Sequence, residues 1–590
     1  MIHSWPNYLQ PEVSPEDIAI NDTGLGFSYN APTTYGGHRW GNRFPVRASM
    51  SYVTGSHAFK FGVSNESAIK DEGSTSSGTQ FLSYTFNNGV PTRITQYAYP
   101  YPDSEPERVS LGTRIDSPFR TVVHAMWDLG AYAQDQWTIK RLTLNYGVRY
   151  DYYDVNIPAI SLGPGRFAGA RQLPAVEHAP RWRDWSPRLG ASYDLFGTGQ
   201  TALKLSIGRY LELTSGTFSS NIAPVTTSVS SANRSWTDAN RDYVPDCDLT
   251  NFAANGECQA IDNQNFGKSN PLATRYADDV VLKGRSYTWD INTEVQHQLG
   301  PGVSVTGGYY HNWDGNYRVT DNAAVAGSDY SPYCITAPAD SRLPGGGGYE
   351  VCGLYDINPD KFGQVSNVVT QASNFGKYTR KADFFSASIS TRFGPGIRLA
   401  GGVDTGRTVS DVCFEVDSPG ATAANLPGAS ASPVPHTGTT IDGRPTCRAV
   451  TPVGANTQLK LNGSYPLPMD FSVSAALQNL PGTAYLATYA VPTAQVLRSL
   501  GRNLSGGTRT VNVPLISPQT EYENRRTQLD VRISKIIPAG RGRVQANLDI
   551  FNMLNANSVL EVNNTFGAQW RQPSRILDPR MIQLSARVEF

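Results

Sequence analysis

The sequence predicts an all-β fold in which one large antiparallel sheet crosses a membrane as a β-barrel. Three observations support this prediction. Apolar and polar residues alternate over segments of about ten residues, short turns join these segments in pairs, and long polar loops separate the pairs. Such segments are long enough to cross a hydrocarbon layer when tilted, whereas strands of soluble proteins average about five or six residues.

The composition of the 590-residue chain agrees with this fold class. Its 30 tyrosines, 10 tryptophans and 55 glycines favour strands and tight turns over helices. Because 50 basic residues balance 50 acidic ones, we expect no nucleic-acid partner. The mean hydropathy is −0.36 and we find no apolar run of about 18 residues, which excludes a helical span but not a barrel.

The alternation is clearest in residues 141–152. One face of this segment carries leucine, tyrosine and valine, and the other face carries polar and charged residues. Residues 46–52, 471–478 and 582–590 repeat the pattern. We expect the charged residues of the polar faces to line the lumen of the barrel as a solvated wall, among them Arg149, Asp151, Lys204, Arg532 and Asp549.

Turns and loops alternate along the chain. The sequence predicts tight turns at residues 54–57, 139–140, 197–199, 300–302, 394–396 and 538–540. Long polar loops are expected at about residues 155–183, 213–281, 313–380 and 409–452. About 18 strands fit between them, and this asymmetry is typical of outer-membrane barrels with short periplasmic turns and long extracellular loops.

The six cysteines fall into three local pairs inside the long loops: Cys247 with Cys258, Cys334 with Cys352, and Cys413 with Cys447. None has the C-x-x-C spacing of a zinc site or redox pair. We predict three disulfides and an oxidising compartment, the alternative being six unrelated free thiols. The first residues carry no secretory signal, so we expect the true N-terminus of the protein to be absent from this sequence.

Several motifs in fixed order indicate a family. They are DLGAYAQDQW at 128–137, LTLNYGVRYD at 142–151, WSPRLGASYD at 185–194, DIFNMLN at 549–555 and the terminal Phe590. As a set they resemble the C-terminal barrel of TonB-dependent receptors of the Oar-like kind, from about residue 45 to the end of the chain. The resemblance implies an outer-membrane receptor that takes up an unidentified substrate, and it implies that Phe590 is the signal for the barrel assembly machinery.

The resemblance also implies parts that we do not find in the sequence. These are a barrel of 22 strands, a plug domain, a TonB-contacting box and a regulatory-like β-sandwich. We therefore expect residues 45–590 to be a partial barrel and residues 1–44 to be part of an extracellular loop, in a gene fragment or after a mis-called start. Such a chain would contact membrane lipid and the substrate, but it would reach the TonB complex only through the missing plug. By itself it would not perform energised transport.

One loop has the residue types of a calcium site. Oxygen-bearing side chains recur at short intervals, which suits a hard cation; they belong to Asp238, Asn240, Asp242, Asp246 and Asp248. The glycine and the distant glutamate of an EF-hand are absent, so the alternative is an Asp/Asn-rich turn in a disulfide-closed loop. No other cofactor is expected.

No catalytic residues are predicted. Gly267-Lys268-Ser269 lacks the preceding glycine and the strand-to-helix context of a phosphate loop, and the eight histidines form no zinc motif. We therefore expect no enzyme. A surface binding or adhesion protein without transport remains the alternative, and a secreted carbohydrate-active enzyme would need converging carboxylates that one sequence does not identify.

Overall fold

The structure is a computed structural model of the chain. It describes residues 2–4, 7–9, 16–32, 36–75, 81–100, 119–212, 217–394, 396–423, 440–441, 443–540 and 542–589. Within these ranges, no helix is both long and apolar enough to cross a membrane. The predicted turn residue Pro395 and the predicted assembly signal Phe590 lie outside the described residues.

One antiparallel sheet of 18 strands dominates the described part of the chain. Its long strands are β5 (Gly36–Thr54), β6 (His57–Thr75), β9 (Phe119–Ile139), β10 (Leu142–Asn156), β13 (Arg181–Asp194), β14 (Thr201–Leu211), β17 (Tyr287–Gly300), β18 (Val303–Gly315), β23 (Thr379–Phe393), β24 (Ile397–Asp411), β29 (Gln458–Leu467), β30 (Phe471–Leu480), β33 (Arg526–Ala539), β34 (Gly542–Phe551) and β37 (Met581–Glu589). Each pairs with the long strands next to it in sequence.

Three short strands complete the sheet. β1 (Ile2–Ser4) and β2 (Asn7–Leu9) both pair with β5, and β28 (Arg448–Val450) pairs with β24 beside β29. Because β1 and β2 lie end to end beside β5, and β28 and β29 lie end to end beside β24, the 18 strands occupy 16 positions across the sheet. The predicted all-β fold with a large antiparallel sheet is confirmed. The predicted boundary at residue 45 falls inside β5, which begins at Gly36.

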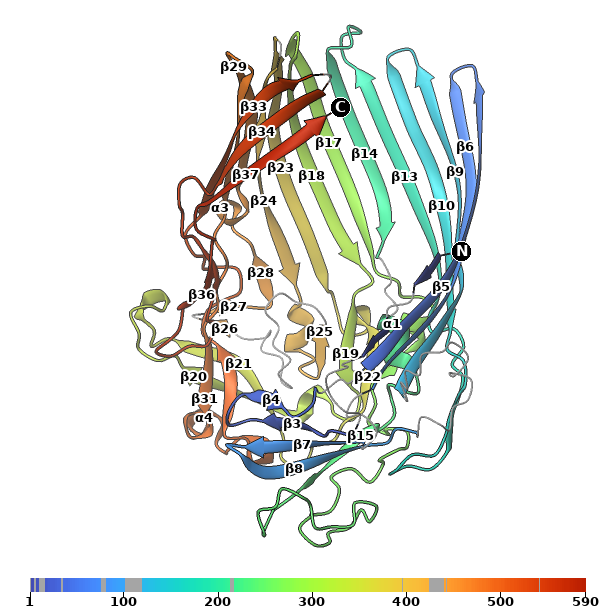
Figure 1. Ribbon diagram of the computed structural model, residues 1–590, viewed down its shortest axis with the longest axis vertical. Coiled ribbons are helices and arrows are strands. Elements are labelled where there is room, and N and C mark those ends of the chain that lie inside the picture. Colours follow the sequence, from blue (N-terminus) through green and yellow to red (C-terminus); the bar gives the residue numbers. More distant parts are fainter. Residues whose placement is uncertain are drawn as a thin grey trace.

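The sheet curves around a lengthwise axis, with tight turns at one end and long loops at the other (Figure 1). β5 and β37 lie on opposite flanks in this view. In the described residues, β37 pairs with β34 alone, and β1 and β2 pair with β5 alone, so the sheet has two edges.

The outward face of the sheet is apolar and exposed. Cross-strand neighbours continue it from strand to strand: Met50 opposes Phe61, Phe61 opposes Ala133, and Ala133 opposes Val148. Exposed side chains of this face on other strands are Leu189, Leu205, Val295, Phe385 and Leu584. An apolar surface of this extent is not tolerated in water, and it fits contact with lipid.

Most turns at the tight end form where they are predicted. β5 ends at Thr54 and β6 begins at His57, and Lys140 adopts a φ of 52° between β9 and β10. One turn was not predicted, and like the turn at Lys140 it contains no glycine. It joins β29 to β30 through Met469 and Asp470, with φ of 62° and 60°.

The other end of the sheet carries the loop cap, which we define as the described residues of segments 16–32, 81–100, 157–180, 217–286, 316–378, 412–457, 481–525 and 552–580. The cap contains a five-stranded sheet, in the order β15 (Ser231–Ser235), β8 (Val90–Tyr97), β7 (Leu82–Asn87), β3 (Ala19–Asp22) and β4 (Phe27–Tyr29). Residues of segment 1–44 thus take part in both the main sheet and the cap.

Smaller elements build the rest of the cap. Two four-stranded sheets consist of β16 (Arg275–Tyr276), β22 (Asn367–Gln371), β19 (Arg318–Asn322) and β25 (Ala421–Ala423), and of β20 (Tyr330–Thr336), β21 (Glu350–Ile357), β26 (Thr440–Ile441) and β27 (Arg444–Pro445). The strand pairs are β11 (Ile160–Leu162) with β12 (Arg171–Leu173), β31 (Thr488–Pro492) with β32 (Thr510–Pro514), and β35 (Val559–Val562) with β36 (Pro573–Ile576). The helices are α1 (Thr217–Ile222), α2 (Asp278–Val281), α3 (Val453–Asn456), α4 (Thr493–Leu500) and the 3-10 turns η3 (Gly327–Asp329), η4 (Pro344–Gly346), η5 (Ala372–Asn374), η6 (Cys413–Val416) and η7 (Ser505–Gly507).

Candidate functional site

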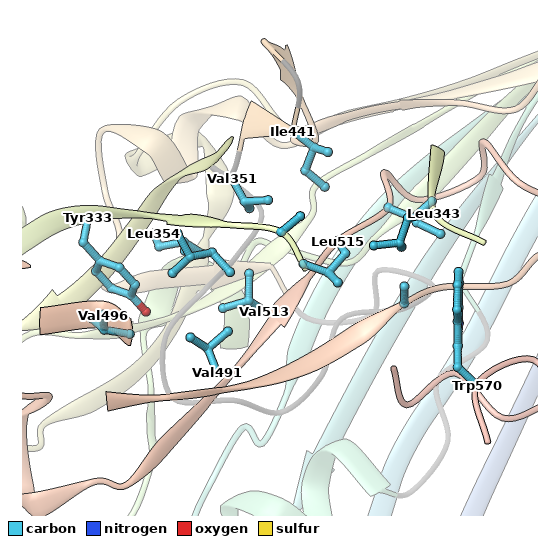
Figure 2. Close-up of a cluster of buried hydrophobic side chains, with 14 of the residues drawn as sticks. Tyr333, Leu343, Val351, Leu354, Ile441, Val491, Val496, Val513, Leu515 and Trp570 are labelled. Carbon is cyan, nitrogen blue, oxygen red and sulfur yellow. The ribbon is translucent and has the colours of Figure 1, made fainter. Parts of the chain in front are cut away.

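The loops of the cap pack together around shared apolar cores. Figure 2 shows one core, to which four loops contribute, including Val351 and Leu354 of β21, Ile441 of β26, Leu515 and Trp570. A second core joins β7 and β8 to the loop that carries Trp236. Because these residues are buried, the loops form a folded layer over one end of the sheet rather than separate flexible segments.

Polar contacts tie the same loops together. The backbone N–H of Cys334 donates to Ser499 Oγ at 2.9 Å, and Trp570 Nε1 donates to the Leu486 carbonyl at 2.8 Å. Arg502 forms an ion pair with Asp356 across two loops. These bonds join segments far apart in sequence, so the surface that the cap presents has a defined shape.

The three predicted disulfides are present. Cys247 pairs with Cys258, Cys334 with Cys352, and Cys413 with Cys447. Among the described residues no cysteine is free. The bond from Cys334 links β20 to β21, and Cys258 and Cys447 are buried in cap cores, so the disulfides brace the cap.

The predicted calcium loop is only partly brought together. Asn240 Nδ2 lies between two carboxylates and donates to Asp242 Oδ2 at 3.1 Å and to Asp246 Oδ2 at 3.0 Å. Asp238 instead accepts the backbone N–H groups of Arg241 and Tyr243.

Asp248 accepts bonds from the N–H and Oγ1 of Thr250. These bonds lower the pKa of Asp248 below its usual range, its bond from the Thr250 hydroxyl contributing most. In the part of the chain that the structure describes, no group of three His, Cys, Asp or Glu side chains is arranged to hold a metal ion. Calcium binding by this loop therefore stays a prediction.

The inner face of the sheet beneath the cap is polar. Arg149 Nε donates to Asp151 Oδ1 at 2.7 Å, and Asp151 lies opposite the buried Asp184 on β13. Arg149 fits here because Gly130 leaves room, since a Cβ at Gly130 would lie 1.8 Å from the guanidinium. Asp184 accepts a bond from Arg209 at 3.2 Å.

The remaining predicted lumen residues lie on two other parts of this wall. Arg532 binds Asp549 through two bonds of 2.5 and 3.1 Å, next to a hydrogen bond of 2.8 Å between Ser534 and Asn547. Lys204 Nζ donates to Gln296 at 2.8 Å. These charged groups mostly bond to one another, which is expected of a solvated wall.

The wall meets the cap around Trp182, whose indole N–H donates to the Val280 carbonyl at 2.8 Å. Arg285 lies above both the Trp182 and the Tyr153 rings, at 5.7 and 5.8 Å from the ring centroids. The loop between β14 and β17 is thereby anchored on the inner face. The arrangement is a polar wall covered at one end by a folded, disulfide-braced layer.

Comparison with known proteins agrees with this architecture. Residues 5–348 match the family model described as an outer membrane beta barrel domain. The chain belongs to this family. The chain is located in the outer membrane, as the sequence predicts.

One curated protein and one solved structure are similar to the chain. Part of the chain is 26% identical over 247 residues to the TonB-dependent transporter Oar of Myxococcus xanthus, covering 40% of this chain and 21% of that protein. The whole chain superposes on the outer membrane transporter YddB of Escherichia coli with a TM-score of 0.52 and 10% identity, covering 59% of that chain. The predicted resemblance to a barrel of the TonB-dependent receptor type is confirmed. The matches span less than two thirds of either relative.

Proposed function

We propose that this chain is the barrel part of a receptor that binds a solute at the cell surface and passes it inward by energised transport. The supporting observation is the loop cap: seven inter-strand loops of an outer-membrane sheet pack into one folded layer over a polar wall. Loops that only connected strands would have no need for shared cores. In this proposal the cap faces the outside, where disulfides persist, and no catalytic step occurs.

The proposal includes further strands and a gate supplied from outside residues 1–590. β37 and the strands at the β5 flank have unpaired edges among the described residues, and unpaired backbone groups in lipid are strongly unfavourable. Sequencing the DNA upstream of Met1 tests this part. An in-frame region that encodes a plug supports it, whereas a stop codon followed by a promoter contradicts it.

Within this division, residues 45–590 supply most of the barrel strands and most of the cap, while residues 1–44 contribute β1, β2, the start of β5 and the cap strands β3 and β4. The contact with the TonB complex would then belong to the plug, and assembly in the membrane would depend on the terminal segment. Deleting Phe590 from the protein and measuring the amount inserted in the outer membrane tests the assembly role. Unchanged insertion would contradict it.

An uptake assay separates transport from surface binding. Cells that produce the whole protein are given a labelled ligand, with and without an uncoupler that collapses the proton gradient. The proposal expects accumulation that the uncoupler abolishes, while binding at the surface persists. Binding with no uncoupler-sensitive accumulation would favour the alternative, an outer-membrane binding or adhesion protein.

A further inference from the structure

A pocket of about 670 Å³ opens in the cap where β3, β4 and β7 meet the loop of residues 238–248. Four aromatic side chains and two acidic ones are among the residues that line it: Tyr29, Tyr84, Phe86, Tyr243, Glu16 and Asp17. The pocket thus combines aromatic rings with carboxylates. It is a different feature from the predicted calcium site and from the polar wall.

The rings form a fixed floor and more open walls. Tyr84 and Phe86 are buried and pack against Trp236 in the second cap core, at centroid distances of 5.0 and 6.1 Å. Tyr243 stacks on Phe86 with 6.1 Å between centroids and 20° between planes. Tyr29 and Tyr243 complete the aromatic lining, so a ligand in the pocket lies next to rings from β4, β7 and the loop of residues 238–248.

Tyr243 is held in an unfavourable conformation. Its φ is 63°, a region that bulky side chains rarely adopt, and its side chain is 57% exposed. Two carboxylates fix this turn, since Asp238 accepts the N–H of Tyr243 at 3.1 Å and Asp242 accepts that of Val244 at 2.8 Å. Strained residues of this kind are found disproportionately at ligand-binding positions. The loop therefore holds an exposed ring over Phe86 at some conformational cost.

The charged groups of the described pocket lining are acidic, and the guanidinium of Arg166 acts on the lining residue Tyr84 from outside the lining. Glu16 and Asp17 are at its lining, and none of the described lining residues is basic. A third carboxylate, Asp22, lies one hydrogen bond behind the wall and accepts N–H bonds from Gly89 at 2.7 Å and Asn88 at 2.9 Å. Burial opposes its ionisation, but its backbone hydrogen bonds prevail and lower the pKa of Asp22, so the group is charged at neutral pH.

We propose that this pocket binds a ligand through an ammonium or alkylammonium group. Such a cation is attracted both to the faces of the rings and to the surrounding carboxylates, and clusters of aromatic rings are the usual receptors for it. An anionic ligand would be repelled by the same carboxylates. The proposal rests on the proposed function in one respect, that the cap faces the medium, and it adds the chemical class of the ligand.

Binding to the full chain in detergent micelles tests this assignment by ligand-observed NMR. The probes are choline, its uncharged isostere 3,3-dimethyl-1-butanol, and N-acetyl-lysine methylamide, which represents the side chain of a peptide. We expect a cationic probe to bind at least tenfold more tightly than the isostere. Choline alone indicates a free alkylammonium solute, and the lysine derivative alone indicates a peptide.

Three variants locate the site. Tyr243→Ala is expected to weaken binding of the cationic probe about tenfold, the scale of one cation–ring contact when desolvated. Tyr243→Phe keeps the ring and should bind like the unaltered chain. Phe362→Ala removes a similarly exposed ring elsewhere in the cap and is the matched control.

Three results would overturn the inference: equal affinity for choline and its isostere, unchanged binding in Tyr243→Ala, or no binding of either cationic probe at about 10 mM. Because this assay uses purified protein, it is independent of transport. Uptake that continues in the presence of an uncoupler would contradict the proposed function, but it would not affect the conclusion drawn from the binding assay.

Discussion

Replacing Leu515 by alanine should loosen the cap without disturbing the membrane strands. Leu515 is fully buried in the core of Figure 2, its N–H donates to the Ala487 carbonyl, and its carbonyl accepts a 2.6 Å bond from Tyr349. Truncating a buried leucine removes its transfer free energy and leaves a cavity, which together destabilise by about 3 kcal/mol. Since about 1.4 kcal/mol corresponds to a factor of ten, local opening should become about a hundred times more frequent.

Hydrogen exchange followed by mass spectrometry measures this opening peptide by peptide. Peptides covering β21 and β32 should lose protection by about two orders of magnitude, whereas peptides from β17 and β18 should be unchanged. The matched control is Leu497→Ala on α4, because that leucine is 44% exposed and lies outside the core. The reasoning would be refuted if the control loosened the cap equally, or if the Leu515 variant left cap protection unchanged.

Three further predictions concern the braces of the cap. Replacing both Cys334 and Cys352 by serine should destabilise the β20–β21 region by about 3 kcal/mol, from the 18-residue separation of the pair, and faster proteolysis of this region would confirm it. Arg342 hydrogen-bonds Asp340 and holds the pKa of that carboxyl at about 2, below its ordinary value of 3.8; the stability gained is present above about pH 4 and lost as the pH falls toward 2. Cap protection should therefore decline over that interval in the unaltered chain, whereas in Arg342→Gln it should be lower above about pH 4 and decline less below it, because the pKa of Asp340 returns toward its unfolded value; identical profiles would contradict this. Calorimetric titration of the chelator-treated chain with Ca²⁺ should give heat that Asp246→Asn diminishes, and absence of heat at about millimolar Ca²⁺ would exclude the calcium site.

The sequence predicted most of the main sheet because its long strands carry their own signals, whereas the short strands β1 and β2 lie in a segment that was expected to be a loop. Alternation and a flanking turn are local, so residues 142–151 indicate their strand without knowledge of any partner. The disulfides were predictable for a similar reason, since each joins cysteines within one loop. The turn at Met469 and Asp470 was missed because both residues adopt positive φ, a conformation that usually signals itself through glycine.

The organisation of the cap was not predictable in this way. Its core depends on contacts among loops that are distant in sequence, and segments 481–525 and 552–580 showed no pattern that marked them as packing partners of β21. The aromatic pocket was not predictable from the sequence for the same reason. Tyr29, Phe86 and Tyr243 meet only because three separate segments converge on one sheet. Local sequence signals therefore predicted the strands, whereas the candidate binding surface required the folded arrangement.

In the proposed receptor the cap faces the medium and the tight turns face the periplasm. A single cysteine tests it, because the native cysteines are all paired. Val244→Cys places a thiol in the cap and Thr198→Cys places one in a tight turn, both at exposed positions. With a membrane-impermeant maleimide on intact cells, the account predicts labelling of Val244→Cys at once and of Thr198→Cys only after the outer membrane is permeabilised. Labelling of the turn but not of the cap in intact cells would contradict it.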